Sequence, residues 1–440
     1  MRLLRERPLR ILITNMWLLG RSGSETIVRD VALGLRRRGH SPIIYAPSAG
    51  APADELKARG ISVIDSLDQM DEAPDIVHGH HNIPTVEALV RFPTCPAIWF
   101  CHDAIAWHDK APLFERIHRY VAVDDRCRDR LLEDGVAVER ITVLHNAVDL
   151  ERIPPRPEAL PLRPQRAVAF TKTVSQIPVL EQACSRAGLS FRAFGRGPGI
   201  ETAEPERELV KHDIVFATAR SAIEALCAGA AVIVCDGRGL GGLVSTDNYE
   251  RLRALNFGAR SLTEDVTVDA VISAIEQYDR DDAVSVVHRL RADADLVTFL
   301  DQVEILYCEA IAARASYLES TETHQRTLLQ FLHEWLPQAP DNRWPWQKER
   351  QALVELCENL DRACADLRRQ CAASQSESEA LRAKTAEFQN MAVQLQGQLE
   401  SVRSSRFYRL AAAVHKLLGP SSARESSHKN LAQDLRKRLP

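Results

Sequence analysis

Two glycines near the start of the chain stand where a backbone could hold an anion. Gly20 and Gly23 lie between a β-branched run, RILITNM, and an amphipathic stretch that Ser24 or Glu25 would open as a helix. Glycine lets a backbone approach an anion closely, and the free N–H groups at a helix N-terminus favour negative charge. The spacing therefore predicts a phosphate site, although glycine turns after a first strand also occur for packing alone.

A histidine at the end of another apolar run is the second candidate. His102 follows AIWFC and precedes Asp103. Open α/β sheets bind ligands outside the carboxyl ends of their strands, and imidazole can donate or accept a hydrogen bond near neutral pH. We therefore expect His102 in an active site, with a buried histidine of structural role as the alternative.

His78, His80 and His81 look at first like a metal cluster. Alternate residues of a strand point to opposite faces, so His80 shares its face with His78 and not with His81. We therefore predict no metal there. The Asp-x-Asp motif at Asp293 and Asp295 lies in a polar helical stretch, and we interpret it as a solvated helix face.

The elements that must position these residues alternate along the chain. Strand-like and helical stretches follow one another from residue 9 to 144, which predicts βαβ units and a parallel sheet. Proline and arginine then concentrate at 153–166, and a domain boundary is expected there because proline suits neither element. The alternation restarts at AVAFT and closes with a helical pattern from about Asp281 to Ala315. The expected fold class is α/β with two Rossmann-like parallel-sheet domains.

Composition restricts the function classes. The 440 residues are 45% apolar and 26% charged, as in soluble globular proteins. The formal charge of −4 gives no reason to expect nucleic acid as a partner. The N-terminus lacks the apolar core of a secretory signal, and no stretch reaches the roughly 20 apolar residues of a membrane span. Ten cysteines without metal-ligand spacing indicate reduced packing residues, so a cytoplasmic protein is expected.

The C-terminal part shows a different pattern. After a Trp- and Pro-bearing linker at 316–346, apolar positions seven apart predict a coiled coil at 347–402 and with it a homo-oligomer. A helix packed on another surface is the alternative, because the second series of positions is mostly small or polar. Residues 403–440 carry nine basic against two acidic residues beside an apolar helical face. They predict a basic amphipathic tail for an anionic membrane surface, or equally a docking helix.

The order of these features resembles the family-4-type GT-B glycosyltransferases of bacterial surface-glycan synthesis. The resemblance covers roughly residues 9–315. In the first half it rests on the Gly20 to Glu25 loop, Arg-Gly-His at 38–40, DIVHGHH at 75–81, FCHDAIAW at 100–107 and VLHNAVDLERI at 143–153, with Ala147 where the family has glycine. In the second half SFRAFGRGPG and RSAIEALCAGAAVIVCDGRGLGG are similar to the donor-site motifs.

The resemblance implies a GT-B fold with an acceptor domain at 1–155 and a nucleotide-sugar donor domain at 156–315. Glu224 would accept hydrogen bonds from the donor ribose, and His102 would lie beside the reacting sugar. Backbone amides and cations would hold the donor; the residues implied are Gly20, Gly23, Lys172, Gly195, Arg196, Gly197, Ser221, Gly239 and Gly241. The expected reaction is transfer of a hexose to a glycan or lipid-linked saccharide with retained configuration, with no cofactor and no metal, at the inner face of the cytoplasmic membrane.

Two departures from the family pattern favour a rival hypothesis. Phe216 stands eight residues before Glu224, where the family usually has a further glutamate. Ile177 stands near an expected lysine, and Lys172 near an expected arginine. Arg196 and Arg238, each in a glycine-rich stretch, could replace these cations or could simply be solvated. The rival is a catalytically degenerate GT-B scaffold that binds a nucleotide or glycan weakly and acts through its coiled coil.

Overall fold

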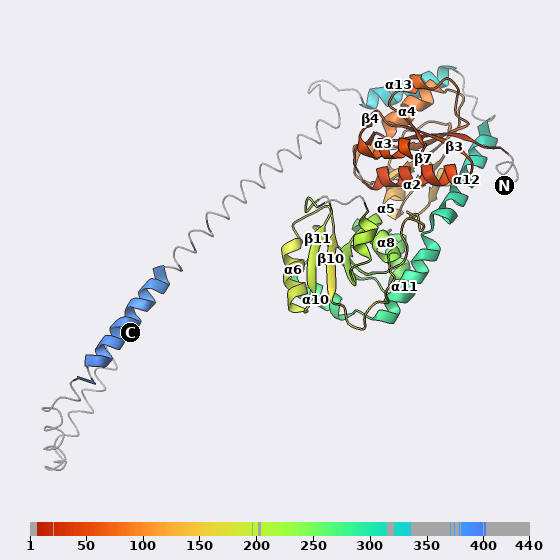
Figure 1. The fold of residues 1–440 in the computed structure, drawn as a ribbon. Coiled ribbons are helices and arrows are strands. Elements are labelled where there is room, and N and C mark those ends of the chain that lie inside the picture. Colours follow the sequence, from red (N-terminus) through yellow and green to blue (C-terminus); the bar gives the residue numbers. More distant parts are fainter. Residues whose placement is uncertain are drawn as a thin grey trace, which may run out of the picture. The chain divides into compact units, whose positions relative to one another are not determined.

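The computed structural model describes residues 7–20, 22–195, 197–200, 204–314 and 321–335, and further on residues 370, 374, 378, 380–398, 400 and 401. The chain divides into two compact units, residues 1–345 and 346–440. The first unit contains two α/β lobes with separate cores (Figure 1). We call residues 7–147 together with 296–335 the N-lobe, and residues 148–294 the C-lobe.

A seven-stranded parallel sheet forms the centre of the N-lobe, as the alternating sequence predicted. Its strand order is β5-β3-β1-β6-β7-β8-β9. The strands are β1 (Arg10–Thr14), β3 (Ser41–Tyr45), β5 (Ser62–Ile64), β6 (Ile76–His80), β7 (Ala97–Cys101), β8 (Ile117–Ala122) and β9 (Ile141–Val143). The helices of this lobe are α2 (Gly23–Arg37), α3 (Ala51–Ala58), α4 (Asn82–Arg91), α5 (Asp125–Glu133), α12 (Leu296–Ala312) and α13 (Thr321–Trp335), and β2 (Trp17–Leu18) pairs with β4 (Ser48–Ala49).

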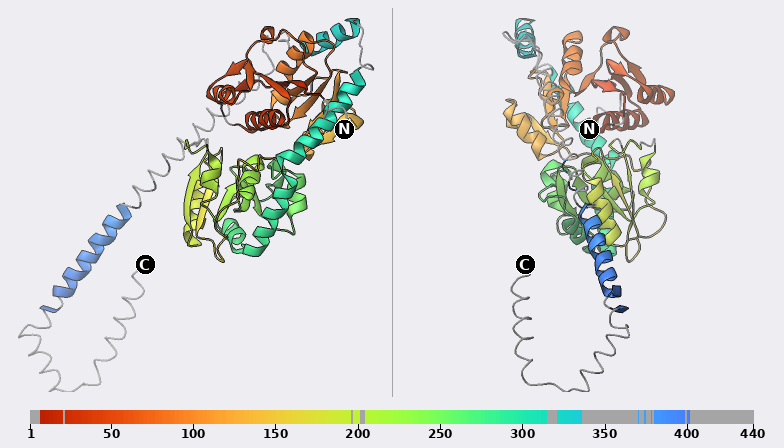
Figure 2. Two further views of the ribbon diagram at one scale, coloured as in Figure 1. Left: turned by 45° about the vertical axis from the view of Figure 1, so that its right-hand side comes forward. Right: turned by 90° about the vertical axis from the view of Figure 1, so that its left-hand side faces the viewer.

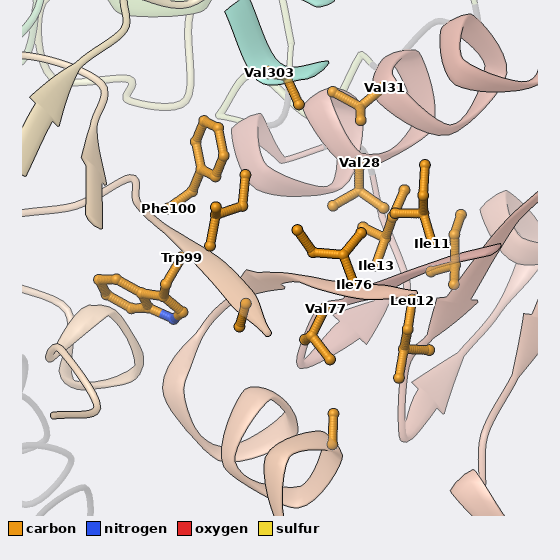
Figure 3. Packing of buried hydrophobic residues seen from close by; sticks show 14 of the residues in the cluster. Ile11, Leu12, Ile13, Val28, Val31, Ile76, Val77, Trp99, Phe100 and Val303 are labelled. Atoms are coloured by element: carbon orange, nitrogen blue, oxygen red, sulfur yellow. The ribbon is translucent and has the colours of Figure 1, made fainter. Parts of the chain in front are cut away.

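Helices cover both faces of this sheet, so its strands are apolar without alternation. Ile11 and Ile13 of β1 point toward Val28 and Val31 of α2, while Leu12 points to the opposite side (Figure 3). All five side chains are fully buried. Because both faces are buried, polar side chains of the sheet can reach a ligand mainly at the carboxyl ends of the strands.

The helical pattern predicted from about Asp281 to Ala315 consists of two helices. Helix α11 (Arg280–Asp293) belongs to the C-lobe, and α12 begins after Asp295, whose carboxylate accepts the N–H of Val297 at 3.2 Å. Val148, in the VLHNAVDLERI segment, bonds to both sides of the break: its N–H donates to Ala294 O and its carbonyl accepts from Leu296 N. Helix α12 then runs back along the N-lobe (Figure 2, teal) and contributes to its core.

The predicted linker at 316–346 also needs correction in the part that the structure describes. Residues 321–335 form α13, which packs on the N-lobe. Trp335 lies 5.7 Å from Trp107 between ring centroids, and Phe331 lies 6.4 Å from Phe114. The aromatic side chains of this stretch therefore anchor a helix.

The C-lobe has a five-stranded sheet of order β11-β10-β12-β13-β14. The predicted strands are confirmed as β10 (Arg166–Phe170), β11 (Ser190–Phe194), β12 (Ile214–Ala217) and β13 (Ala231–Asp236), all parallel. The predicted glycine-rich loop at 237–242 is instead mostly an antiparallel edge strand, β14 (Gly239–Leu243). The helices are α6 (Ile177–Arg186), α7 (Pro205–Leu209), α8 (Ala219–Cys227), α9 (Tyr249–Ala254), α10 (Val268–Glu276) and α11.

In the second unit, residues 380–398 are helical. Leu381, Phe388 and Leu395 recur every seven residues on this helix and are exposed. The rest of the predicted coiled coil at 347–402 lies largely outside the described residues, and the tail at 403–440 lies wholly outside them. Among the helices that the structure describes, none combines the length and apolar composition needed to cross a bilayer.

Candidate functional site

The carboxyl ends of β6 and β7 bring two of the predicted histidines into contact. His80 is the last residue of β6, and His102 follows β7 directly. Nδ1 of His80 lies 2.6 Å from Nε2 of His102. His80 and His78 also lie together, with ring centroids 4.6 Å apart, whereas His81 adopts a positive φ of 62° at the start of α4. The expected pairing of His80 with His78 rather than with His81 is therefore confirmed.

Burial keeps His102 uncharged. Desolvation, assisted by His108 and by the positive charge of Arg220, lowers the pKa of His102 to about 3. Its backbone N–H donates to Oδ1 of Asp109 at 3.0 Å. Burial in turn raises the pKa of Asp109 to about 8. Near pH 7 this end of the sheet thus presents a neutral imidazole able to act as a hydrogen-bond donor or acceptor.

Acidification is expected to destabilise the protein through His78 and His102. Burial lowers the pKa of each to about 3, whereas a histidine in an unfolded chain titrates near 6.5. Between these values the unfolded chain binds protons that the folded chain does not, so the free energy of unfolding falls as pH falls. His78→Phe should reduce this slope by about 1.4 kcal/mol per pH unit, measured by urea unfolding from about pH 6.5 to 5. An unchanged slope would contradict the assignment.

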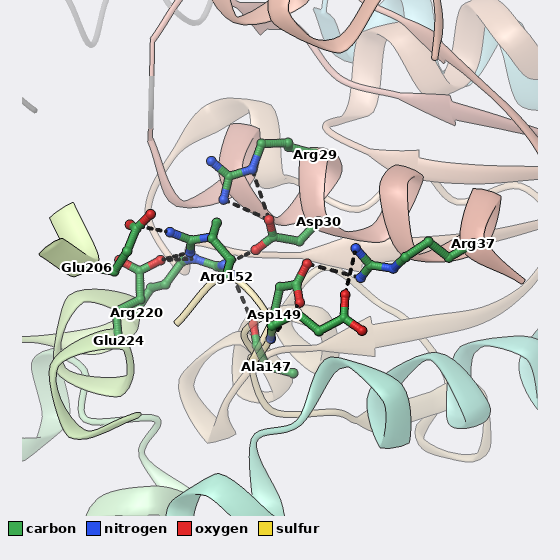
Figure 4. A network of polar contacts seen from close by, with 10 residues as sticks. Arg29, Asp30, Arg37, Ala147, Asp149, Arg152, Glu206, Arg220 and Glu224 are labelled. Atoms are coloured by element: carbon green, nitrogen blue, oxygen red, sulfur yellow. Dashed lines mark hydrogen bonds and ion pairs between the residues drawn. The ribbon is translucent and has the colours of Figure 1, made fainter. Parts of the chain in front are cut away.

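Glu224 lies in α8 and is buried in a network of charges from both lobes (Figure 4). Its Oε1 accepts from Arg152 at 2.9 Å and from Nε of Arg220 at 3.3 Å. Arg220 also pairs with Asp30 of α2 in the N-lobe. Arg152 reaches on to Glu206 at 2.8 Å. The carboxylate expected to hold a ribose is thus already held by two guanidinium groups.

His102 and Glu224 face the same region of the first unit. Arg220, which bonds to Glu224, is also close enough for its charge to lower the pKa of His102. A second pair shows a similar interaction between the lobes. The hydrogen bond to Asp236 raises the pKa of Arg238 and burial lowers it, and the charge of Asp103 adds to the rise. Both electrostatic interactions thus join a group that follows β7 in the N-lobe to an arginine of the C-lobe.

Three loops of the C-lobe meet at the carboxyl ends of its parallel strands. A Cβ on Gly195 would stand 2.4 Å from the carbonyl oxygen of Thr171, and one on Gly197 would stand 2.6 Å from the backbone of Lys172. The N–H of Gly237 donates to the hydroxyl of Thr173 at 3.0 Å. The residues expected to bind the donor at Lys172, Gly195 and Gly197 are therefore neighbours, and the two glycines are required for this close packing.

Gly195→Ala is expected to lower the free energy of unfolding by about 2–4 kcal/mol. The added Cβ would clash with Thr171 O, and φ at Gly195 is +118°, which alanine rarely adopts. Gly23→Ala is the matched control, because a Cβ at Gly23 meets nothing within 4 Å. Urea unfolding of both variants measures the difference in their free energies of unfolding. Equal stabilities would show that the surroundings of Gly195 accommodate the added Cβ without loss of stability.

In the loop that contains Gly20, backbone amides already bind a carboxylate of the chain itself. The carboxylate of Glu25 accepts the N–H groups of Leu19 and Gly20, both at 2.7 Å, and of Ser22 at 2.8 Å. Gly23 is the first residue of α2. A phosphate bound to the amides at Gly20 would have to displace this carboxylate.

The remaining predicted donor residues lie in different settings. Ser221 is half-buried in the first turn of α8, whose first amide, that of Ala219, already donates to Phe257 O at 2.7 Å. Gly239 and Gly241 belong to β14, where added Cβ atoms would stand 2.9 Å from Glu264 O and 2.5 Å from Ser261 O. These two glycines thus permit close backbone packing. Arg196 lies outside the described residues.

His81, His108 and Asp109 place three ligand atoms within 4.8 Å of one another. Nδ1 of His81 accepts the N–H of Met16 at 3.1 Å. A neutral imidazole has one proton, so this bond puts the proton of His81 on Nε2, the nitrogen left for a metal. Metal-bound histidines normally donate from the other nitrogen. The group therefore fits a divalent cation poorly.

Sequence reasoning missed Asp30, Arg152 and Arg220, which surround Glu224. Arg220 precedes Glu224 by four residues on one helix, a spacing at which opposite charges pair. That signal was available from the sequence. Arg152 is brought to Glu224 by the fold of the C-lobe, and Asp30 of the N-lobe reaches Arg220 only through the packing of the two lobes.

Comparisons with known proteins agree with this architecture. Residues 21–152 match the profile of Glycosyltransferase Family 4. A glycosyltransferase from Rickettsia africae ESF-5 is 15% identical with a TM-score of 0.50, over 69% of this chain and 99% of its own. Anabaena HepE solved with UDP-glucose (14%, 0.47, over 69% and 100%) and Thermosynechococcus elongatus sucrose-phosphate synthase (12%, 0.46, over 70% and 100%) are also similar. No curated protein matches the chain.

The two parallel-sheet lobes, the return of α12 to the N-lobe and the matched profile lead to one conclusion. The chain therefore has the GT-B fold, and its residues 21–152 match Glycosyltransferase Family 4.

Proposed function

We propose that the chain moves a hexose from a nucleotide sugar, held by the C-lobe, to a glycan or lipid-linked saccharide on the N-lobe, with retained configuration and no metal. His102 would contact the transferred sugar, and Glu224 would accept hydrogen bonds from the ribose. The observation that carries this proposal is the position of Arg220, which bonds to Glu224 and acts electrostatically on His102. Two groups from separate lobes could thus act on one donor molecule.

The departing nucleoside diphosphate needs positive charge or hydrogen-bond donors already in place. The loops at 171–173 and 236–238 lie beside Gly195 and Gly197 at the carboxyl ends of parallel strands, but their amides largely donate within the chain, as those of Thr173, Gly237 and Arg238 do. Arg238 of the last loop interacts with Asp103 electrostatically and has its side chain 60% exposed, although it also pairs with Asp236. We assign it to the phosphates, where its bidentate geometry suits oxygen acceptors.

A specific observation also supports the rival function, a GT-B scaffold without catalysis. Glu224 is engaged by Arg152 and Arg220. Phe216, at the position of the family's other glutamate, is fully buried in β12 against Phe191. A ribose would have to compete with two charged partners for the carboxylate.

Thermal unfolding with nucleoside diphosphates and nucleotide sugars distinguishes the two functions. A ligand present at 100 times its Kd adds about 2.7 kcal/mol of stability, so one base should raise Tm selectively. Release of the nucleoside diphosphate in the presence of a lipid-linked saccharide then tests transfer, and the anomeric proton signal of the product reports its configuration. A Tm shift without any release would favour the scaffold.

We also propose that the C-terminal segments attach the enzyme to an anionic membrane surface and join copies of the chain. The support is the exposed apolar series Leu381, Phe388 and Leu395 and the basic composition of 403–440. Flotation of the full chain with phosphatidylserine vesicles tests attachment, and sedimentation tests association. A chain that neither floats nor associates contradicts this part alone.

A further inference from the structure

His80 meets His102 in a geometry that suits a single hydrogen bond. The ring planes differ by only 19° and the centroids are 4.9 Å apart, a separation at which two imidazoles meet edge to edge rather than face to face. With Nδ1 and Nε2 at 2.6 Å, the nitrogens face each other close to the ring planes. His80 is fully buried.

The surroundings of His80 decide which ring donates. A neutral imidazole carries one proton. Nε2 of His80 is buried and has no hydrogen-bond partner among the residues that the structure describes. A proton on Nε2 would be an unpaired buried donor, which folded proteins avoid more strictly than an unpaired acceptor. The proton of His80 therefore belongs on Nδ1, and Nε2 of His102 accepts the hydrogen bond from this N–H.

We propose that His80 is a positioning residue, which holds His102 in the tautomer with its proton on Nδ1 so that His102 offers a donor to an oxygen of the transferred sugar. The inference rests on the proposed function only for the identity of that oxygen. The hydrogen bond and the tautomer belong to the free protein.

Neighbouring elements keep His80 in place. The rings of His78 and Phe100 lie 4.6 and 5.4 Å from it between centroids. His78 is itself bonded through Nδ1 to the hydroxyl of Tyr307 in α12. Burial holds the pKa of His80 well below its usual value. His80 is thus a fixed, neutral donor.

The tautomer can be observed directly in the full chain with ¹⁵N-labelled histidine. Two-bond ¹H–¹⁵N correlation spectra distinguish protonated from unprotonated ring nitrogens, and the His102 signals are those lost in His102→Asn. We expect a protonated Nδ1 and an unprotonated Nε2 in His102 at pH 7. A proton on Nε2, or on both nitrogens, would overturn the inference even if the enzyme transfers sugar.

Variants of His80 test the consequence for transfer. His80→Asn keeps an N–H close to the position of Nδ1 and should retain both tautomer and activity within a few-fold. His80→Phe removes it, and kcat should fall about 10- to 100-fold with little change in the KM of the nucleotide sugar. His78→Phe is the matched control, being equally buried on the same face but bonded to Tyr307, and should keep kcat.

These outcomes separate the inference from the proposed function. Wild-type kcat in a folded His80→Phe variant would refute the positioning role. If His80→Phe does not fold, the spectra of the wild type decide the question, because a proton on Nε2 of His102 excludes the positioning role. Absence of transfer by the wild type would refute the proposed function, while the spectra would still settle the tautomer.

Discussion

His102→Ala is expected to lower kcat for sugar transfer at least about 100-fold while leaving the protein folded. The imidazole is held neutral by burial and lies at the carboxyl end of β7, opposite Arg220 of the C-lobe. On the proposed function, removing it takes away a polar contact to the sugar that would strengthen as charge develops in the transition state. The measurement is release of nucleoside diphosphate under saturating donor.

His118→Ala is a suitable control for this variant. His118 lies in β8, and its Nε2 is 3.7 Å from Glu309 of α12, in a half-buried pair. We expect His118→Ala to change kcat less than about two-fold, because a partly exposed ion pair contributes little energy. Near-full activity of His102→Ala, with a Tm close to that of the wild type, would remove His102 from the site.

Glu224→Ala is expected to lower the free energy of unfolding by about 3–5 kcal/mol and to abolish transfer. The carboxylate neutralises Arg152 and Arg220, and its removal leaves both guanidinium groups buried with one acidic partner fewer. Urea unfolding measures the first effect, and nucleotide-induced change in Tm measures loss of the ribose contact.

Two further variants separate these effects. Glu224→Gln keeps the shape of the side chain and should recover part of the stability but not the charge-assisted bonds to the ribose. Glu206→Gln breaks the other pair of Arg152, and should cost stability while leaving nucleotide affinity unchanged. If Glu224→Gln binds nucleotides as tightly as the wild type, Glu224 is a structural partner of Arg152 and Arg220 and not a donor ligand.

The sequence predicted the parallel strands of the two sheets, because most of them are apolar runs covered on both faces, as in β1, β7 and β13. It did not predict β14, since Gly239 and Gly241 read as a loop. Their role depends on backbone at 261 and 264, far along the chain. The break between α11 and α12 was missed for a similar reason, because it is fixed by backbone bonds to Val148.

Individual site residues were easier to find than their partners. His102 and Glu224 could be named from local motifs. The bond between His80 and His102 depends on the register of β6 against β7, in which His80 lies opposite Phe100. The pair of Arg152 with Glu224 depends on the fold of the C-lobe, and the pair of Arg220 with Asp30 depends on how the lobes dock. Spacing along the chain predicts neither pair, whereas the four-residue spacing of Arg220 and Glu224 does predict theirs.

The return of α12 also determines when the N-lobe can be completed during synthesis. Leu296, Leu300, Val303 and Tyr307 belong to its core, yet the ribosome reaches them only after the whole C-lobe has been made. A nascent chain released near residue 155 would display the apolar sides of β7 and β8 to chaperones and proteases. The C-lobe, whose core is built from consecutive residues, faces no such delay, so the later half of the enzyme can mature first.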